Sequence, residues 1–169
     1  MKTREKSIEL LNRAVGEELT AVHQYMYFHF YCSDYGYDPI SDIFRRIAIV
    51  EMMHVERLAE RILFLKGEVD MKLAQPVEKI HQVDKMLEKA VALEEESVNQ
   101  YNEWAKICAE NSDSVTKKMF EDLAGEEESH QDTFETEMDN LRRFGANYLA
   151  LQSLERSKNE AVGPRSNAE

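Results

Sequence analysis

The sequence is poor in cysteine, proline and glycine: its 169 residues include two cysteines, three prolines and six glycines. Two cysteines that form no Cys-x-x-Cys motif argue against a disulfide scaffold, a zinc knuckle or a rubredoxin-type iron site. The rarity of proline and glycine leaves long stretches without helix breakers. We therefore expect long helices and no thiolate framework.

Long apolar runs are also missing. No stretch approaches the roughly 18 apolar residues that a membrane helix needs, and the first residues lead into an amphipathic pattern without an apolar signal core. Because 32% of the residues are charged, we expect a soluble protein with no membrane partner. The missing signal core and the lack of a disulfide framework make the cytoplasm the expected compartment. The net charge of −12 also argues against a nucleic-acid partner. An acidic surface that keeps the protein soluble explains this charge, and attraction of cations is the alternative.

Apolar residues recur with helical spacing, and the alternation typical of strands is absent, so the sequence predicts an all-α fold. Asp38 and Pro39 are typical of an N-cap and a first helical residue, and Gly67 of a helix stop. A polar tail over residues 158–169 is expected to be disordered, which leaves residues 1–157 as one domain. The expected helices span residues 6–33, 39–66, 83–110, 113–144 and 147–155.

The lengths of the connections predict how these helices pack. Short links join the first helix to the second and the third to the fourth, so each pair should be an antiparallel hairpin. The segment 67–82 is long enough to run the length of a bundle, which predicts a four-helix bundle with one long crossover and a short fifth helix. The first and third helices then run antiparallel, so Cys32 and Cys108 fall at opposite ends. They lie far beyond the roughly 7 Å that a disulfide allows, and we expect two free thiols.

A weak internal repeat with a spacing of 76 residues carries the chemical signal. The motif Glu-x-x-His occurs at residue 51 and again at residue 127, and each copy has a partner glutamate 33 residues earlier. The repeat also selects Glu94 from three adjacent glutamates, because only Glu94 lies seven residues before Tyr101, as Glu18 does before Tyr25. The first copy contains Glu18, Tyr25, Glu51 and His54, and the second contains Glu94, Tyr101, Glu127 and His130.

The spacing within each motif has a physical meaning. A glutamate and a histidine three residues apart lie on one face of a helix, so both can bind one metal ion. The same face is otherwise apolar, so four carboxylates and two imidazoles would point into the core, where an unpaired charge costs several kcal/mol. Two divalent cations would neutralise the four carboxylates. A solvated acidic face explains one copy of such a motif, whereas two matched copies point to a dinuclear metal site.

With these residues the sequence resembles the bacterioferritins, the haem-binding branch of the ferritins, over about residues 5–155. The resemblance implies a ferritin-like bundle in which Glu18 and Glu94 are terminal iron ligands and Glu51 and Glu127 are bridges. It also implies one histidine per iron, His54 or His130. Besides the repeat, it rests on Gln24-Tyr25, Glu51-Met52-Met53-His54, Ala59-Glu60-Arg61-Ile62, Leu93-Glu94 and Asn147-Tyr148-Leu149.

The activity implied by this resemblance is that of a ferroxidase that stores iron. Two Fe ions per subunit would give electrons to O₂ or H₂O₂, and the ferric product would be stored as mineral in a hollow shell of 24 identical subunits. An electron-donor protein for iron release is a further implied partner. The two irons should be near-equivalent, because the repeat gives each the same set of ligands.

Two residues beside the ligands have open roles. Tyr25 lies two turns from Glu18 on the same helical face, where it could bond a ligand or supply an electron, but a core tyrosine with a satisfied hydroxyl explains it equally well. From spacing alone Met52 is a packing residue. The resemblance instead implies that Met52 ligates a haem shared across a two-fold subunit interface. The second repeat has Glu128 at the matching place, so no second haem ligand is implied.

Two other functions use the same bundle. A di-iron or di-manganese peroxidase or oxygenase would need the six ligands but no storage shell, and a purely structural bundle would need neither. A rubrerythrin would need a Cys-x-x-Cys module, which is absent. A small twelve-subunit DNA-protecting shell would place its ligands between subunits and lack the fifth helix.

Overall fold

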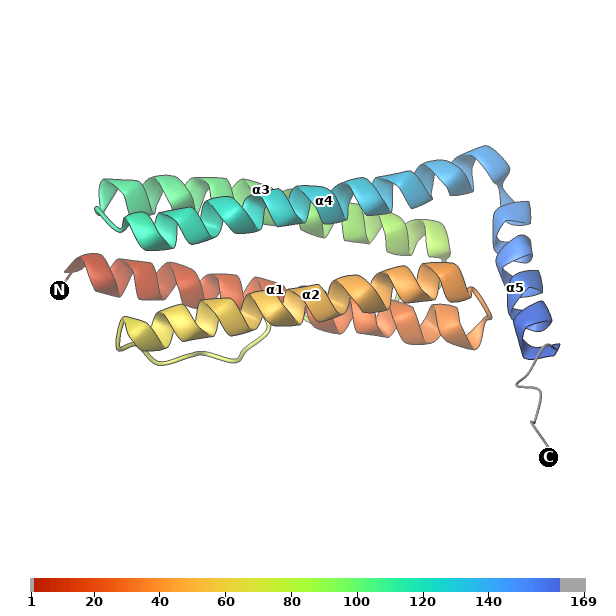
Figure 1. The fold of residues 1–169 in the computed structure, drawn as a ribbon, viewed down its shortest axis with the longest axis horizontal. Coiled ribbons are helices and arrows are strands. Elements are labelled where there is room, and N and C mark those ends of the chain that lie inside the picture. Colours follow the sequence, from red (N-terminus) through yellow and green to blue (C-terminus); the bar gives the residue numbers. More distant parts are fainter. Residues whose placement is uncertain (1, 162–169) are drawn as a thin grey trace, which may run out of the picture.

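The computed structural model describes residues 2–161 and contains five helices in that range, with no strand (Figure 1). The expected all-α fold is confirmed. The helices are α1 (Lys2–Asp34), α2 (Asp38–Phe64), α3 (Val83–Glu110), α4 (Ser114–Phe144) and α5 (Ala146–Ala161).

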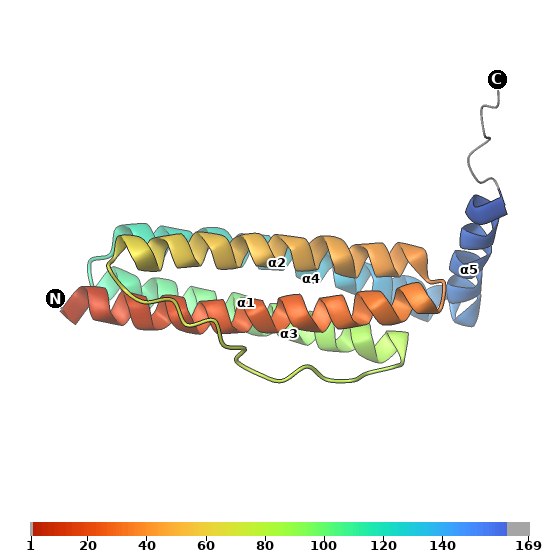
Figure 2. The same cartoon turned by 90° about the horizontal axis from the view of Figure 1, so that it is seen from below.

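Helices α1 to α4 form a four-helix bundle, and α5 lies across one end of it (Figure 1). The helices α1 and α2 form one antiparallel hairpin, and α3 and α4 form the other. The connection between the hairpins runs along the outside of α1, so that α3 begins at the end of the bundle where α1 stops (Figure 2). The expected long crossover and the antiparallel direction of the first and third helices are therefore confirmed. In the described range, no helix is both long and apolar enough to cross a membrane.

A polar stripe on α1 holds the crossover in place. The side-chain oxygen of Asn12 accepts a hydrogen bond from the backbone nitrogen of Asp70 at 2.8 Å. Thr20 accepts from the backbone nitrogens of residues 74 and 75 at 3.0 and 3.2 Å. Gln24 binds the backbone of Glu78 twice, accepting at 2.8 Å and donating at 2.9 Å. Side chains of α1 therefore take the place of a neighbouring strand for these backbone groups of the extended segment.

The ends of α2 differ by a few residues from the prediction. Tyr37 is the N-cap, and Asp38 is the first helical residue, with Pro39 following it. At the other end Lys66, and not Gly67, takes the left-handed conformation (φ 66°), while the backbone nitrogen of Gly67 donates to the Ile62 carbonyl at 3.0 Å. Glycine is still favoured at position 67, because a Cβ there would lie 2.8 Å from Cγ2 of Ile8 and force that side chain to shift. Close packing, rather than backbone conformation, explains this glycine.

The other helix ends lie within one residue of the prediction, except that α1 begins at Lys2, four residues before its expected start, and α5 ends later than expected. Asp113 caps α4 by accepting a hydrogen bond from the backbone nitrogen of Thr116 at 3.1 Å. Helix α5 continues to Ala161, six residues beyond its expected end, so residues 158–161 of the expected tail are helical. Residues 162–169 of that tail lie outside the described residues, and their disorder stays a prediction.

The core consists of two apolar clusters with a polar layer between them. One cluster contains Leu58, Cys108 and Phe120, and the other contains Phe28 and Cys32. Both cysteines are buried and free, and they belong to different clusters, which confirms the prediction of two separated thiols. The polar layer between the clusters contains the repeated glutamates and histidines.

Candidate metal centre

Each of the four long helices contributes to one buried polar cluster. Five of the six predicted ligand side chains are no more than 2% exposed, and His130 is 12% exposed. The cluster is thus brought together as the repeat predicts. Its members are Glu18 from α1, Glu51 and His54 from α2, Glu94 from α3, and Glu127 and His130 from α4.

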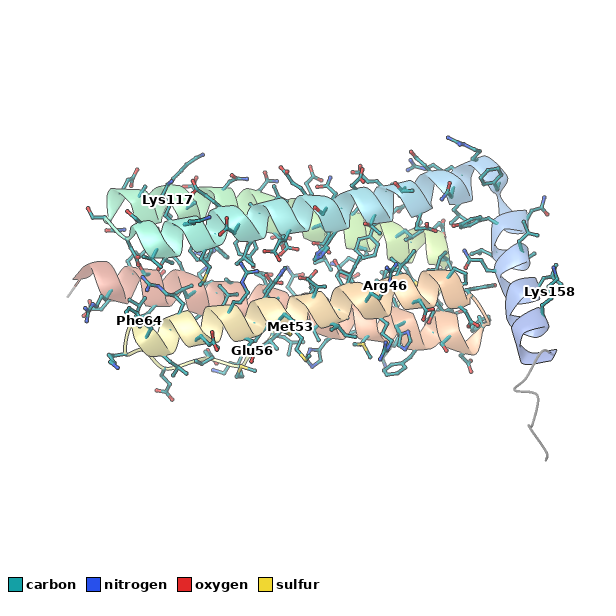
Figure 3. All side chains as sticks on the ribbon, viewed as in Figure 1. Arg46, Met53, Glu56, Phe64, Lys117 and Lys158 are labelled. Carbon is teal, nitrogen blue, oxygen red and sulfur yellow. The ribbon has the colours of Figure 1, made fainter. Side chains whose placement is uncertain are left out.

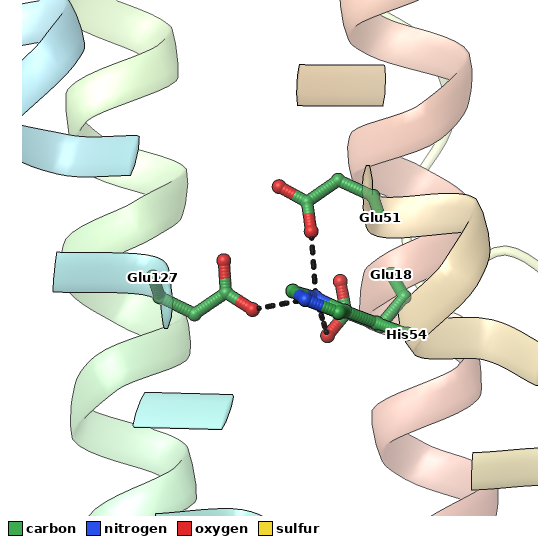
Figure 4. Close-up of side chains that lie close together, drawn as sticks. All are labelled: Glu18, Glu51, His54 and Glu127. Atoms are coloured by element: carbon green, nitrogen blue, oxygen red, sulfur yellow. Dashed lines mark ion pairs between the residues drawn. The ribbon is translucent and has the colours of Figure 1, made fainter. Parts of the chain in front are cut away.

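The first half of the cluster is centred on His54 (Figure 4). The Nδ1 atom of His54 lies 2.9 Å from Oε2 of Glu51, 3.1 Å from Oε1 of Glu127 and 3.4 Å from Oε1 of Glu18. These four residues each offer a ligand atom, and the four atoms lie within 4.8 Å of one another. One cation placed among them would have three carboxylates and one imidazole within reach.

The second half is centred on His130. Its Nδ1 atom lies 2.9 Å from Oε1 of Glu51, 3.1 Å from Oε2 of Glu127 and 3.9 Å from Oε2 of Glu94. Glu51 and Glu127 therefore present one oxygen to each histidine, whereas Glu94 belongs to this half and Glu18 to the other. This sharing is the geometry of two adjacent metal positions with two common carboxylates.

The electrostatics of the cluster favour cations. Both carboxylate oxygens of Glu51, one of Glu127 and the Nδ1 atom of His54 are buried without a hydrogen bond of acceptable geometry. Burial raises the pKa of Glu18 well above its usual range, and the negative charges of Glu127 and Glu51 raise it further. Protons would therefore remain in this layer without metal, and metal binding would release them. Carboxylate and imidazole donors suit divalent iron, manganese or zinc.

The pKa of His130 is set by the opposite balance between burial and neighbouring charge. Burial alone would lower the pKa of His130, but the carboxylates of Glu127 and Glu51 outweigh it and raise the pKa to about 10. The pKa of Glu127, which burial would raise, is lowered to about 2 by its bonds to His130 and His54. Negative charge is thus concentrated on a shared carboxylate, between the two positions where cations would sit.

Two tyrosines connect the hairpins at the site. The hydroxyl of Tyr25 donates to Oε1 of Glu94 at 2.5 Å, and the hydroxyl of Tyr101 donates to Glu18. Tyr25 therefore bonds a predicted ligand, as its place beside the ligands suggested, and this ligand lies on α3. Tyr101 on α3 bonds Glu18 on α1 in the same way, so the two tyrosines have equivalent positions, as the repeat indicated.

Glu126 is a residue that sequence reasoning missed. Its Oε2 lies 2.9 Å from the outer nitrogen, Nε2, of His54, and Arg57 donates to its Oε1 at 2.7 Å. The position 76 residues earlier is Val50, which cannot hold His130 in this way. The repeat therefore gave no signal for Glu126, and the two halves of the centre are not equivalent in the surroundings of their histidines.

Met52 lies apart from this cluster. Its side chain is 53% exposed on α2, and the side chain of the adjacent Met53, labelled in Figure 3, is 49% exposed. Ile49, one turn earlier, is also exposed. Met52 thus lies on the outer surface of α2, away from the buried cluster, as its helical position requires.

Comparison with known proteins points to one family. Residues 8–144 match the ferritin family, a ferritin-like domain. The bacterioferritin of Desulfovibrio desulfuricans is 35% identical over 145 residues, which cover 86% of this chain and 81% of that protein. The bacterioferritin of Rhodobacter capsulatus is 35% identical over 151 residues, covering 89% and 94%.

Solved structures agree with this match. The bacterioferritin of D. desulfuricans, whose diiron site has been studied in different catalytic states, superimposes with a TM-score of 0.88 at 34% identity, covering 90% of this chain and 89% of that chain. The R. capsulatus bacterioferritin superimposes with a TM-score of 0.84 at 32% identity, covering 97% and 98%. The latter structure has a metal-free dinuclear site and a haem iron in a crystallographic special position.

Proposed function

We propose that this chain, which belongs to the bacterioferritin family, stores iron and oxidises Fe(II) to Fe(III) at the cluster between its four long helices. The observation that carries the proposal is the sharing of Glu51 and Glu127 between His54 and His130, in a layer where buried oxygens lack other partners. An unfilled layer of this kind would cost several kcal/mol without cations.

Fe(II) is the substrate, and two positions can receive it. Glu18 and His54 would hold one iron, Glu94 and His130 the other, and the two shared carboxylates would bridge them. Each iron loses one electron, and O₂ or H₂O₂ accepts the pair. Hard carboxylate oxygens suit the ferric product, while imidazole suits both oxidation states.

The protein's own side chains prepare these positions. Tyr25 and Tyr101 hold the carboxylates of Glu94 and Glu18 in place. In Glu94 the tyrosine bonds Oε1, and Oε2 faces His130 and is free for a cation. The carboxylate of Glu126 accepts a hydrogen bond from Nε2–H of His54, which leaves Nδ1 as the lone-pair donor inside the cluster. The apolar clusters on both sides of the layer exclude bulk water, so the charges act at low dielectric.

Met52 is proposed as a haem ligand, shared with a second subunit across a two-fold axis. An exposed thioether is a suitable axial ligand for haem iron, and the haem iron of the R. capsulatus relative sits in a special position of its crystal. The Met52→Leu variant should lose the haem absorption band while keeping Fe(II) oxidation. Met53→Leu is the matched control, because Met53 is exposed to a similar degree on the same helix.

The storage shell is proposed to contain 24 subunits, and a separate electron-donor protein is proposed to release the iron. Family membership supports both, and so do large apolar side chains on the surface of the isolated subunit, Phe30, Phe64 and Leu151 among them. A cytoplasmic location also stays a proposal.

The deciding experiment adds Fe(II) aerobically to purified protein and measures ferric absorbance, particle size and iron content. Storage predicts a particle of hundreds of kDa that takes up far more than two irons per subunit. Glu127→Ala should abolish rapid oxidation, whereas Glu128→Ala, which changes an exposed neighbour, should not. A monomer that saturates at two irons would support a di-iron or di-manganese peroxidase or oxygenase instead.

A further inference from the structure

A column of aromatic rings leads away from the metal centre. It starts at Tyr25, whose ring centroid lies 6.1 Å from that of Phe44. Phe44 is 5.2 Å from Phe28, and Phe28 is 6.2 Å from Tyr27. The first three rings are fully buried, whereas Tyr27 is only partly buried, so the column passes from the core towards the surface of α1.

At the surface the column continues through a stack of rings. The Tyr27 hydroxyl lies 2.8 Å from Nε2 of His81, which belongs to the crossover. The His81 ring stacks on Tyr31 at 4.9 Å and 8°, and Tyr31 stacks on Tyr35 at 4.5 Å and 20°. Tyr35 is 54% exposed. Metal binding uses none of these four residues, which we call the surface tyrosine stack.

The chemistry of tyrosine gives this arrangement a meaning. A phenol gives up an electron readily only when its proton can leave at the same time, so a redox-active tyrosine needs a base at its hydroxyl. Tyr25 has such a base in Glu94, and Tyr27 has one in His81. Phenylalanine rings lie between these two tyrosines, where packed π-systems shorten the through-space gaps for an electron.

We propose that the surface tyrosine stack is a one-electron exchange site, through which an external reductant repairs Tyr25 after it has been oxidised at the metal centre. The proposal rests on the Fe(II) oxidation proposed above. Its substrate class is small one-electron donors that also carry a proton, such as ascorbate or phenols. Tyr35, the exposed end of the stack, would be their point of contact.

Tyr25 would be oxidised, and would need repair, when H₂O₂ reacts with a centre that holds a single Fe(II). Peroxide takes two electrons, one from Fe(II) and one from Tyr25: Fe²⁺ + TyrOH + H₂O₂ + H⁺ → Fe³⁺ + TyrO• + 2 H₂O. Tyr27 then gives an electron to the Tyr25 radical and its proton to His81, while Tyr25 regains a proton through Glu94. Tyr31 then gives an electron to the Tyr27 radical, which regains its proton from His81, and Tyr35 gives an electron to Tyr31 in turn. Tyr31 is partly exposed and Tyr35 is exposed, so each releases its phenol proton to water while it is a radical, and Tyr31 regains one from water when it is reduced. The external donor reduces the Tyr35 radical with one electron and one proton.

The test locates radicals on the peptide. Assembled protein carrying one Fe(II) per subunit is mixed with H₂O₂ and a nitroso spin trap, and adducts are mapped by peptide mass spectrometry. Ferric absorbance is followed in parallel. Tyr27→Phe keeps the packed ring and removes only the hydroxyl beside His81. Tyr148→Phe is the control, because this tyrosine also bonds a side chain, Glu137, but lies outside the column.

The expected result is trap adducts on Tyr31 and Tyr35 in the unmodified protein, reduced at least fivefold by Tyr27→Phe and unchanged by Tyr148→Phe. The radical signal of Tyr25 in freeze-quenched samples should last longer in Tyr27→Phe, and ascorbate should shorten it less. Iron oxidation should proceed at the same rate in all three proteins.

Three results would overturn the inference. If spin-trap adducts on Tyr31 and Tyr35 are as abundant in Tyr27→Phe as in the unmodified protein, electrons do not pass along the aromatic column. Normal iron oxidation without any adducts on the surface tyrosine stack would refute this inference alone. Absence of Fe(II) oxidation in the unmodified protein would refute the proposed function, and the inference would fall with it.

Discussion

The choice of Glu94 among three adjacent glutamates can be tested by metal-dependent stability. Glu94 is 2% exposed and belongs to the half of the centre that contains His130, whereas Glu95 is exposed to solvent. The variants Glu94→Gln and Glu95→Gln make the same chemical change one residue apart. Zinc is the appropriate probe, because it binds the same donors and has no redox chemistry.

The size of the effect follows from linkage. A metal ion at 100 times its dissociation constant stabilises the folded state by about 2.7 kcal/mol per site, so two filled sites contribute about 5 kcal/mol. For a chain of this length each kcal/mol raises the melting temperature by about 2–4 °C, which gives a zinc-induced rise of roughly 10–20 °C. Glu94→Gln leaves intact the other group of four candidate ligands, which are Glu18, Glu51, His54 and Glu127, so about half of the rise should remain.

Calorimetry with and without zinc measures the rise, and titration calorimetry counts the ions bound. The unmodified protein and Glu95→Gln should each bind two zinc ions per subunit, and Glu94→Gln should bind one. Each variant is compared with its own metal-free form, so a change in intrinsic stability does not enter the comparison. Two tightly bound ions in Glu94→Gln, or a lost site in Glu95→Gln, would refute the assignment of ligands.

Other predictions concern stability and accessibility. Asp113→Ala should lower the free energy of unfolding by about 2 kcal/mol at pH 7, because Asp113 caps α4 and accepts from charged and hydroxyl donors. Burial would raise the pKa of Asp113, but these bonds lower it below 3.8. The stabilisation is therefore complete above that pH and is lost as the pH falls through the folded-state pKa. Denaturation at pH 7 and at successively lower pH should show the difference in unfolding free energy between the two proteins becoming smaller. Cys32 and Cys108 should resist thiol reagents at pH 8 in the folded protein and react as two thiols after unfolding, because burial raises their pKa values to about 12 and about 11; rapid labelling of the folded protein would contradict this. Gly67→Ala should cost about 1–3 kcal/mol in thermal or urea unfolding, because its Cβ would press on Ile8, and an unchanged midpoint would show that this contact relaxes freely.

The sequence by itself determined the helices and the face on which the chemistry lies. Apolar periodicity and helix-breaking residues placed α3 at its observed bounds, and connection lengths predicted the crossover. The repeat selected the six residues that meet in the core, because residues at fixed helical spacings must share a face. Glu94 could be separated from Glu95 and Glu96 for the same reason.

Only the tertiary structure decided which side chains on different helices are in contact. Helical spacing says which way Tyr25 points, but its partner is Glu94 on another helix, because the axial shift between α1 and α3 is set by side-chain packing along the whole bundle. The same holds for Glu126, whose contact with His54 has no counterpart in the repeat, since Val50 occupies the matching position. Periodicity along one helix carries no information about the rotation and shift of its neighbours. The candidate ligands could therefore be read from the sequence, while their sharing between two positions, and the unequal support of the two histidines, follow from how the four helices pack.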